Sequence, residues 1–128
     1  MHPVVLDVVA GLTNDGTAYP VACEAAREAA QRGSRVKFLQ VAPEGLGAEE
    51  RQDLDRSTFR AALLALRRRR RVPCTFEVIA GDPATVLIER SADAGLLVVG
   101  RGGVGDDGDV AQQCNRNASC DVLTVATR

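Results

Sequence analysis

The sequence has 128 residues, which is enough for one domain with a hydrophobic core, and we expect a single domain over residues 1–128. Its formal net charge is −1, so no overall electrostatic attraction to nucleic acid or to a membrane surface is expected. Only 3% of the residues are aromatic, which disfavours a base-stacking platform for single-stranded nucleic acid. No apolar run approaches the roughly 18 residues of a membrane span. The first residues also lack the basic start of a signal peptide, so we expect a cytoplasmic protein.

The cysteines and the histidine do not form a metal-binding or catalytic pattern. The four cysteines are Cys23, Cys74, Cys114 and Cys120, no two of them form a CxxC pair, and the one histidine is His2. We therefore predict no metal site, no Ser–His or Cys–His pair and no catalytic residue. In a reducing cytosol the four thiols are expected to be buried or half-buried. Cys114 and Cys120 flank the last predicted helix, so a redox-active pair is the alternative.

The first half of the chain predicts two strands, each followed by a helix. A valine-rich stretch predicts a strand over 4–11, and a polar, glycine-containing turn follows it. Small residues at helical spacing predict a helix over 19–32, which Gly33 ends. A second strand is expected over 35–41 and, after a loop, a long helix over 48–71.

Five consecutive arginines occupy residues 67–71, at the end of this long helix. Cations near a helix C-terminus complement the helix dipole, which explains the run as a solvated helix end. A patch that binds polyanions is the functional alternative. Because the chain as a whole is slightly acidic, we favour the helix end.

The second half of the chain continues the alternation. Asp82 followed by Pro83 is typical of a helix start, with Asp82 as the N-cap. The remaining predictions are a strand over 74–79, a helix from Pro83, a strand over 96–99, a short polar helix over 110–117 and a strand over 121–127. Repeated right-handed crossovers make the predicted fold α/β: a single open parallel sheet with helices on both faces, Rossmann-like. Ligands in such folds bind at the carboxyl ends of the strands.

A glycine-rich loop follows the buried strand at 96–99. Five glycines lie between Gly100 and Gly108, and glycine lets backbone amides approach an anion closely. A phosphate-binding loop and a flexible surface loop are the two interpretations that glycine content leaves open. The loop also spells Gly-x-Gly-x-x-Gly. That dinucleotide fingerprint belongs in the first strand–helix unit and this copy lies in the last, so we disfavour a dinucleotide oxidoreductase.

Three segments, in order and at fitting distances, resemble universal stress proteins. Residues 15–17 (Asp-Gly-Thr), ahead of an alanine-rich helix, resemble the opening turn of that family. Residues 81–84 (Gly-Asp-Pro-Ala), leading into the strand at 96–100, are similar to its most recognisable segment. Residues 118–125 resemble its closing strand, with Asp121 where proline is usual. The resemblance implies a five-stranded sheet of order 3-2-1-4-5, a homodimer paired through the last strand, and a site for ATP or another adenine nucleotide.

The same resemblance implies which residues hold the adenosine half of a nucleotide. Asp15 resembles the acidic residue that the family places at the adenosine end. The first turn is longer than usual, so Thr13 could occupy that place instead. Val41, at the end of the second strand, resembles the residue whose backbone meets adenine.

The phosphate half is implied by the glycine loop. Gly100 and Gly103 match the first part of the family's phosphate motif. Aligning back from Cys120 places Gly108 and Asp109 at its Gly-Ser position, in a loop that is shorter than usual and with a carboxylate in place of the hydroxyl. The nucleotide-binding residues that the resemblance implies are Thr13, Asp15, Val41, Val99, Gly100, Gly103, Gly108 and Asp109.

Acidic residues weaken the phosphate end of this expected site. Asp106, Asp107 and Asp109 bring negative charge beside the phosphates, and Arg101 alone is nearby in sequence to offset it. A Mg²⁺ ion that bridges the carboxylates to a triphosphate is expected only if a nucleotide is bound. Two functions stay open: a regulatory domain that binds an adenine nucleotide without strong catalysis, or a dimeric module that has lost nucleotide binding and acts through protein partners.

Overall fold

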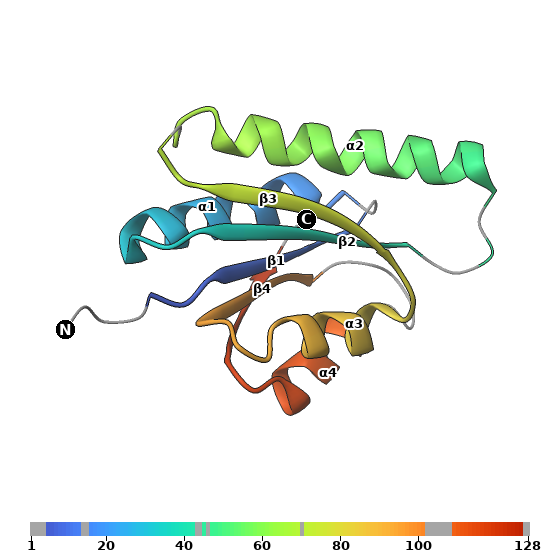
Figure 1. The fold of residues 1–128 in the computed structure, drawn as a ribbon. Coiled ribbons are helices and arrows are strands. Elements are labelled where there is room, and N and C mark those ends of the chain that lie inside the picture. Colours follow the sequence, from blue (N-terminus) through green and yellow to red (C-terminus); the bar gives the residue numbers. More distant parts are fainter. Residues whose placement is uncertain are drawn as a thin grey trace.

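The computed structural model describes residues 5–13, 16–42, 45, 47–69, 71–101 and 109–126, in which strands and helices alternate along the chain (Figure 1). The elements are β1 (Val8–Leu12), α1 (Ala18–Arg32), β2 (Val36–Ala42), α2 (Ala48–Leu66), β3 (Cys74–Ala80), α3 (Pro83–Arg90), β4 (Leu96–Arg101), α4 (Asp109–Asn117) and β5 (Asp121–Ala126). The strands form one 5-stranded sheet of order β3-β2-β1-β4-β5, and every neighbouring pair is parallel. The predicted α/β fold and its strand order are therefore confirmed.

Helices cover both faces of this sheet, so the molecule has three layers (Figure 1). All five residues of β1 are buried, which is what a central strand covered on both faces requires. Val8 and Ala10 face the cluster formed with α1 and α2, whereas Val9 faces the cluster formed with α3 and α4. No helix in the described ranges is long and apolar enough to cross a bilayer.

Helix α1 lies against the sheet through alanines. Ala22, Ala25 and Ala29 have no exposed surface, and these small side chains let the helix backbone approach the strands closely. Gly33 ends the helix in the left-handed conformation, with φ of 66°, and the next amide, of Ser34, donates to the carbonyl of Ala29 at 2.8 Å. The predicted stop at Gly33 is confirmed.

Most predicted element ends are within one or two residues of the observed ones, but two elements differ by more. The first strand begins at Val8 and includes Leu12, rather than running over 4–11. The long helix ends at Leu66, rather than at residue 71. The amides of Arg67 and Arg69 donate to the carbonyls three residues earlier, at 3.2 and 2.9 Å, so the chain tightens into turns that carry it back to β3.

Helix α4 contributes two buried side chains to the core although most of its residues are polar. Ala111 and Cys114, which lie on one side of this helix, are 4% and 0% exposed and contact the cluster that contains Leu97 and Val99. These two small side chains are enough to fix α4 beside α3 on the second face of the sheet.

Candidate functional site

The two central strands, β1 and β4, separate at their carboxyl ends. Their ladder covers three residue pairs and ends at Ala10 opposite Val98, although β1 continues to Leu12 and β4 to Arg101. On their outer sides both strands stay paired to the end, β1 with β2 and β4 with β5. This point of separation, called the crevice below, lies where the strand order reverses, which is the position at which open α/β sheets bind ligands.

The first turn of α1 closes one side of this crevice. A Cβ added to Gly100 would lie 2.7 Å from both Cβ and Oγ1 of Thr17, so the glycine backbone packs directly on the threonine. The hydroxyls of Thr13 and Thr17 are hydrogen-bonded at 3.1 Å. The structure thus brings together two residues of the expected site, Thr13 and Gly100, and adds Thr17, which the sequence reasoning missed. The signal was present, because Thr17 completes the Asp-Gly-Thr turn.

The end of β2 extends beyond its ladder with β1, beside the crevice. Strand β2 runs to Ala42, whereas its ladder with β1 ends at Gln40 opposite Leu12. The backbone of Val41 and Ala42 therefore extends past the strand that covers the rest of this side of β2. The side chain of Val41 is 7% exposed and belongs to the same apolar cluster as that of Val99.

The remaining expected site residues belong to the loop after β1 and to the glycine-rich loop after β4. Asp15, Gly103 and Gly108 lie outside the described residues. Asp109 is the first residue of α4. Because α4 leads to β5, whose first residue pairs with the first residue of β4, the N-terminus of α4 is at the same edge of the sheet as the crevice.

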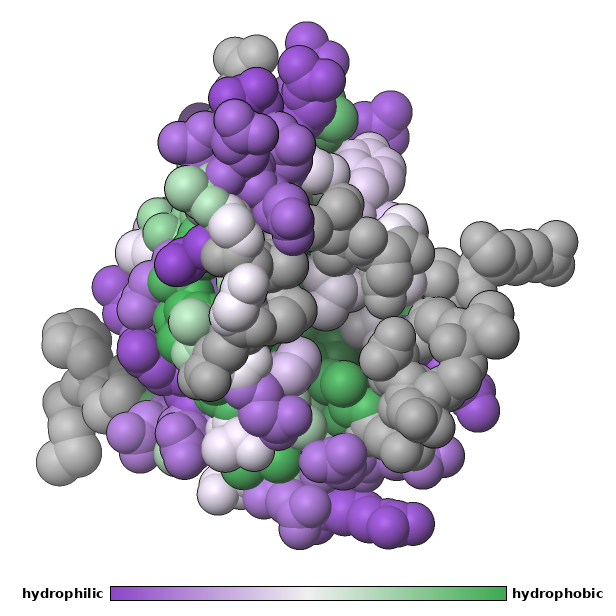
Figure 2. Space-filling model, turned by 90° about the vertical axis from the view of Figure 1, so that its right-hand side faces the viewer, coloured by the Kyte–Doolittle hydropathy of each residue, from purple (hydrophilic) through white to green (hydrophobic). Residues whose placement is uncertain are grey.

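The described residues around the crevice provide positive charge that would favour binding of an anion. Arg101 ends β4, is exposed, and takes part in no ion pair with another part of the described chain. The first turn of α1 contains no acidic residue, so nothing there opposes the positive end of the helix dipole. Figure 2 looks onto this edge of the sheet, with hydrophobic atoms near its middle and hydrophilic atoms above and below them. The arrangement suits a ligand that combines an apolar ring with an anionic group.

The four thiols lie in different environments. All four cysteines are free, and Cys114 is fully buried in α4. Burial, with a smaller contribution from the charge of Cys120, raises the pKa of Cys114 to about 11, which opposes thiolate formation at neutral pH. The expectation that every thiol is at least half-buried is wrong for Cys74, which is exposed because it opens the edge strand β3. No group of three or more possible metal ligands occurs among the described side chains.

One protein-family model matches almost the whole chain. The model described as "Universal stress protein family" matches residues 7–126 of this chain. The comparison with curated proteins gave no match.

Solved structures give the same result at the level of the fold. This chain is similar to a universal stress protein in complex with cAMP, with 22% identity, a TM-score of 0.77, and 98% of this chain and 100% of that chain covered. It is also similar to the universal stress protein from Archaeoglobus fulgidus in complex with dAMP, with 22% identity, a TM-score of 0.74, and 95% of this chain and 98% of that chain covered. A third similar structure is a universal stress protein family protein from Arabidopsis thaliana with AMP bound, with 19% identity, a TM-score of 0.64, and 96% of this chain and 92% of that chain covered.

Proposed function

The chain belongs to the universal stress protein family, and on that basis we propose that it binds an adenine nucleotide in the crevice between β1 and β4. In this proposal the protein is a cytoplasmic regulatory domain that responds to the bound nucleotide and has no strong catalytic activity. The observation that carries the proposal is the separation of the two central strands beyond Ala10 and Val98, beside Thr13, Thr17 and Gly100. The three relatives with cAMP, dAMP and AMP support the choice of ligand class.

The described residues fit the adenosine half of such a ligand. Adenine lies against the apolar cluster of Val41 and Val99 and meets the backbone of β2 where β1 no longer covers it. Hydroxyls from the first turn, with Asp15 or Thr13 in the role that the family gives to its acidic residue, meet the ribose.

The phosphate half is where this chain differs from the family motif. Gly100, Gly103 and Gly108 offer backbone amides to phosphate, and Arg101 offers a cation. Asp109 and the two aspartates before it add negative charge to the same loop. We therefore propose that AMP binds more tightly than ATP, and that Mg²⁺ narrows the difference because it offsets the extra phosphate charge.

Titration calorimetry with adenosine, AMP and ATP, with and without Mg²⁺, tests the proposal. Replacing Arg101 by glutamine should weaken AMP binding by about five- to tenfold and leave adenosine binding within about twofold, because only the phosphate loses a partner. Arg116→Gln, in the last turn of α4, is the matched control and should change neither affinity. Absence of heat and of any melting-temperature increase with all three ligands at several millimolar would exclude the nucleotide function.

A second candidate function rests on the free edge of β5. This strand ends the sheet, and its apolar residues Val122, Leu123 and Val125 are only half-buried. An edge strand of this kind can pair with a second copy, which supports a homodimer formed through β5 that acts through protein partners. Light scattering behind a sizing column should then give twice the 13.6 kDa of the chain. A dimer that binds no nucleotide would favour this second function, whereas a monomer would exclude it.

A further inference from the structure

A groove runs along the outer side of α1, between this helix and the segment that follows α2. It consists of three adjoining cavities of about 500, 380 and 210 Å³. The first two share residues 67–69, and the last two share Ala30, Arg71 and Val72. Together they extend from Tyr19 in the first turn of α1 to Gly33 at its end.

The arginines of this groove carry uncompensated charge. Arg67, Arg68, Arg69 and Arg71 line it, and none of these four forms an ion pair with any residue that the structure describes. Four unpaired cations in one place are unusual in a chain whose net charge is −1. The segment after α2 is therefore a local basic surface.

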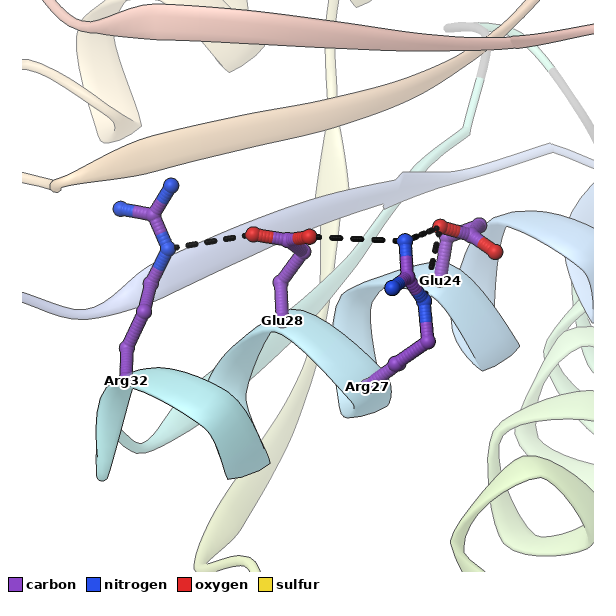
Figure 3. A network of polar contacts seen from close by, with 4 residues as sticks. All are labelled: Glu24, Arg27, Glu28 and Arg32. Atoms are coloured by element: carbon purple, nitrogen blue, oxygen red, sulfur yellow. Dashed lines mark hydrogen bonds and ion pairs between the residues drawn. The ribbon is translucent and has the colours of Figure 1, made fainter.

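The opposite wall of the groove is neutralised. Arg27 on α1 pairs with Glu24 at 2.7 Å and with Glu28 at 3.5 Å, and Glu28 also pairs with Arg32 at 3.3 Å (Figure 3). The hydrogen bond to Glu24 raises the pKa of Arg27, in keeping with this pairing. Of these residues, Glu24 and Arg27 line the groove. The two walls thus differ: one carries free guanidinium groups, and the other carries a carboxylate that is already paired.

Apolar surface lies between the two walls. The first cavity is lined by Leu64 and Tyr19, whose side chains are 43% and 50% exposed, and by the small Ala65. Exposed apolar groups next to unpaired cations suit a ligand that is both acidic and partly hydrophobic. A uniform polyanion such as RNA gains little here, because the groove offers one aromatic ring for stacking and places Glu24 on its wall.

The length of the groove indicates an extended ligand. Helix α1 has 15 residues, so its axis is about 22 Å long at about 1.5 Å per residue. An extended peptide covers that distance with about seven residues at about 3.3 Å each. We propose that this groove binds an acidic peptide segment of a partner protein. Its carboxylates lie on Arg67, Arg68, Arg69 and Arg71, and an apolar side chain lies on Leu64 and Tyr19.

Fluorescence anisotropy with a labelled peptide tests the proposal. The probe is an extended heptapeptide of glutamates with two leucines, and its counterpart carries glutamine in place of every glutamate. The acidic probe should bind and should lose at least about tenfold in affinity when the salt rises from about 50 to about 300 mM, because the contacts are exposed ion pairs. The glutamine peptide should not bind.

Matched variants locate the binding surface. The double variant Arg68→Gln/Arg69→Gln should weaken the acidic peptide at least about tenfold. Arg56→Gln/Arg60→Gln, which removes two exposed arginines from the body of α2, should change its affinity by less than about twofold. Leu64→Asn should weaken the peptide while leaving the salt dependence unchanged, because it removes only the apolar contact.

Two outcomes would overturn the proposal: no binding of the acidic peptide, and equal binding by the glutamine peptide. If the peptide stays unbound, binding of a single-stranded RNA heptamer that the Arg68→Gln/Arg69→Gln variant abolishes would identify the groove as a nucleic-acid site instead. AMP affinity, measured in the same variants, separates this groove from the nucleotide crevice. It should be unchanged, so failure of one proposal leaves the other standing.

Discussion

Gly100 packs so closely on Thr17 that a side chain at this position cannot be accommodated without a shift. Replacing it by alanine should destabilise the protein by about 1–3 kcal/mol, because the new Cβ would lie 2.7 Å from Cβ and Oγ1 of Thr17 and α1 would have to move. Urea unfolding measures the loss. Gly47→Ala is the comparison variant, since a Cβ there meets no heavy atom within 4 Å, and it should cost less. Equal losses in the two variants would contradict the close packing of Gly100 on Thr17.

Asp7 holds the amino ends of β1 and β2 together. Its Oδ2 accepts from Arg35 at 2.8 Å and lies 3.5 Å from Nζ of Lys37. The hydrogen bond from Arg35, together with the two positive charges, holds the pKa of Asp7 below its usual value. A carboxyl group with a lowered folded-state pKa stabilises the fold above its unfolded pKa of about 3.9 and loses that contribution as the pH falls through the folded value.

Replacement of Asp7 by asparagine should therefore reduce the stability of the protein most above about pH 4. At pH 7 the variant should be less stable by under about 1 kcal/mol, because the ion pair is partly exposed and is screened by water and salt. The difference should shrink below about pH 4 and disappear once the carboxyl group is protonated in both states. Urea unfolding of both proteins at several pH values measures this, and a gap that persists to about pH 2 would rule out the titration of Asp7 as its cause.

Individual site residues were predictable only in part. Thr13 and Gly100 follow from the family resemblance, and the structure does bring them to the same crevice. Thr17 was not predicted as a site residue because its contact with Gly100 depends on how α1 packs across β4. Local sequence patterns do not predict such a tertiary contact. Val41 and Val99 could be named from the family resemblance, but their shared cluster depends on the registers of β2 and β4 in the sheet.

At the scale of elements, the alanine stripe of α1 sets how closely this helix lies on the sheet. Ala25→Leu should destabilise the protein by about 1–3 kcal/mol, because a larger side chain must push the helix away from the strands. Ala30→Leu on the exposed side of the same helix should stay within about 0.5 kcal/mol of the parent. Thermal unfolding of the two variants tests this, and a tolerated Ala25→Leu would show that the helix can move outward freely.

Element types were easier to predict than element ends. Alternating strand and helix patterns identified the elements that the structure describes, and α3 also has a clear cap in Asp82, whose carboxylate accepts from the amide of Thr85 at 3.1 Å. The polar α4 gave the weakest pattern. The end of α2 was misplaced because arginine is a good helix former and gives no stop signal. The helix ends early because the chain must turn back to enter β3 at Cys74, a tertiary requirement that lies beyond residues 67–71.

For the whole molecule, we propose that residues 1–128 unfold as one domain. The sheet joins both halves of the chain through β1, which pairs with β2 and with β4, so neither half has a complete core alone. Far-ultraviolet circular dichroism and alkylation of the buried Cys114 should therefore report the same urea midpoint. A labelling midpoint well below the dichroism midpoint would show that α4 and its neighbours form a separate cooperative unit.

The strand order also has a consequence for the growing chain on the ribosome. The central strand β1 is made first, but the partner that covers its second edge, β4, is made only after three helices and two further strands. Until residue 96 has emerged, an apolar strand that ends up fully buried presents an open hydrogen-bonding edge. Such an edge is a template for intermolecular pairing, so a chain halted before β4 would need a chaperone to stay in solution.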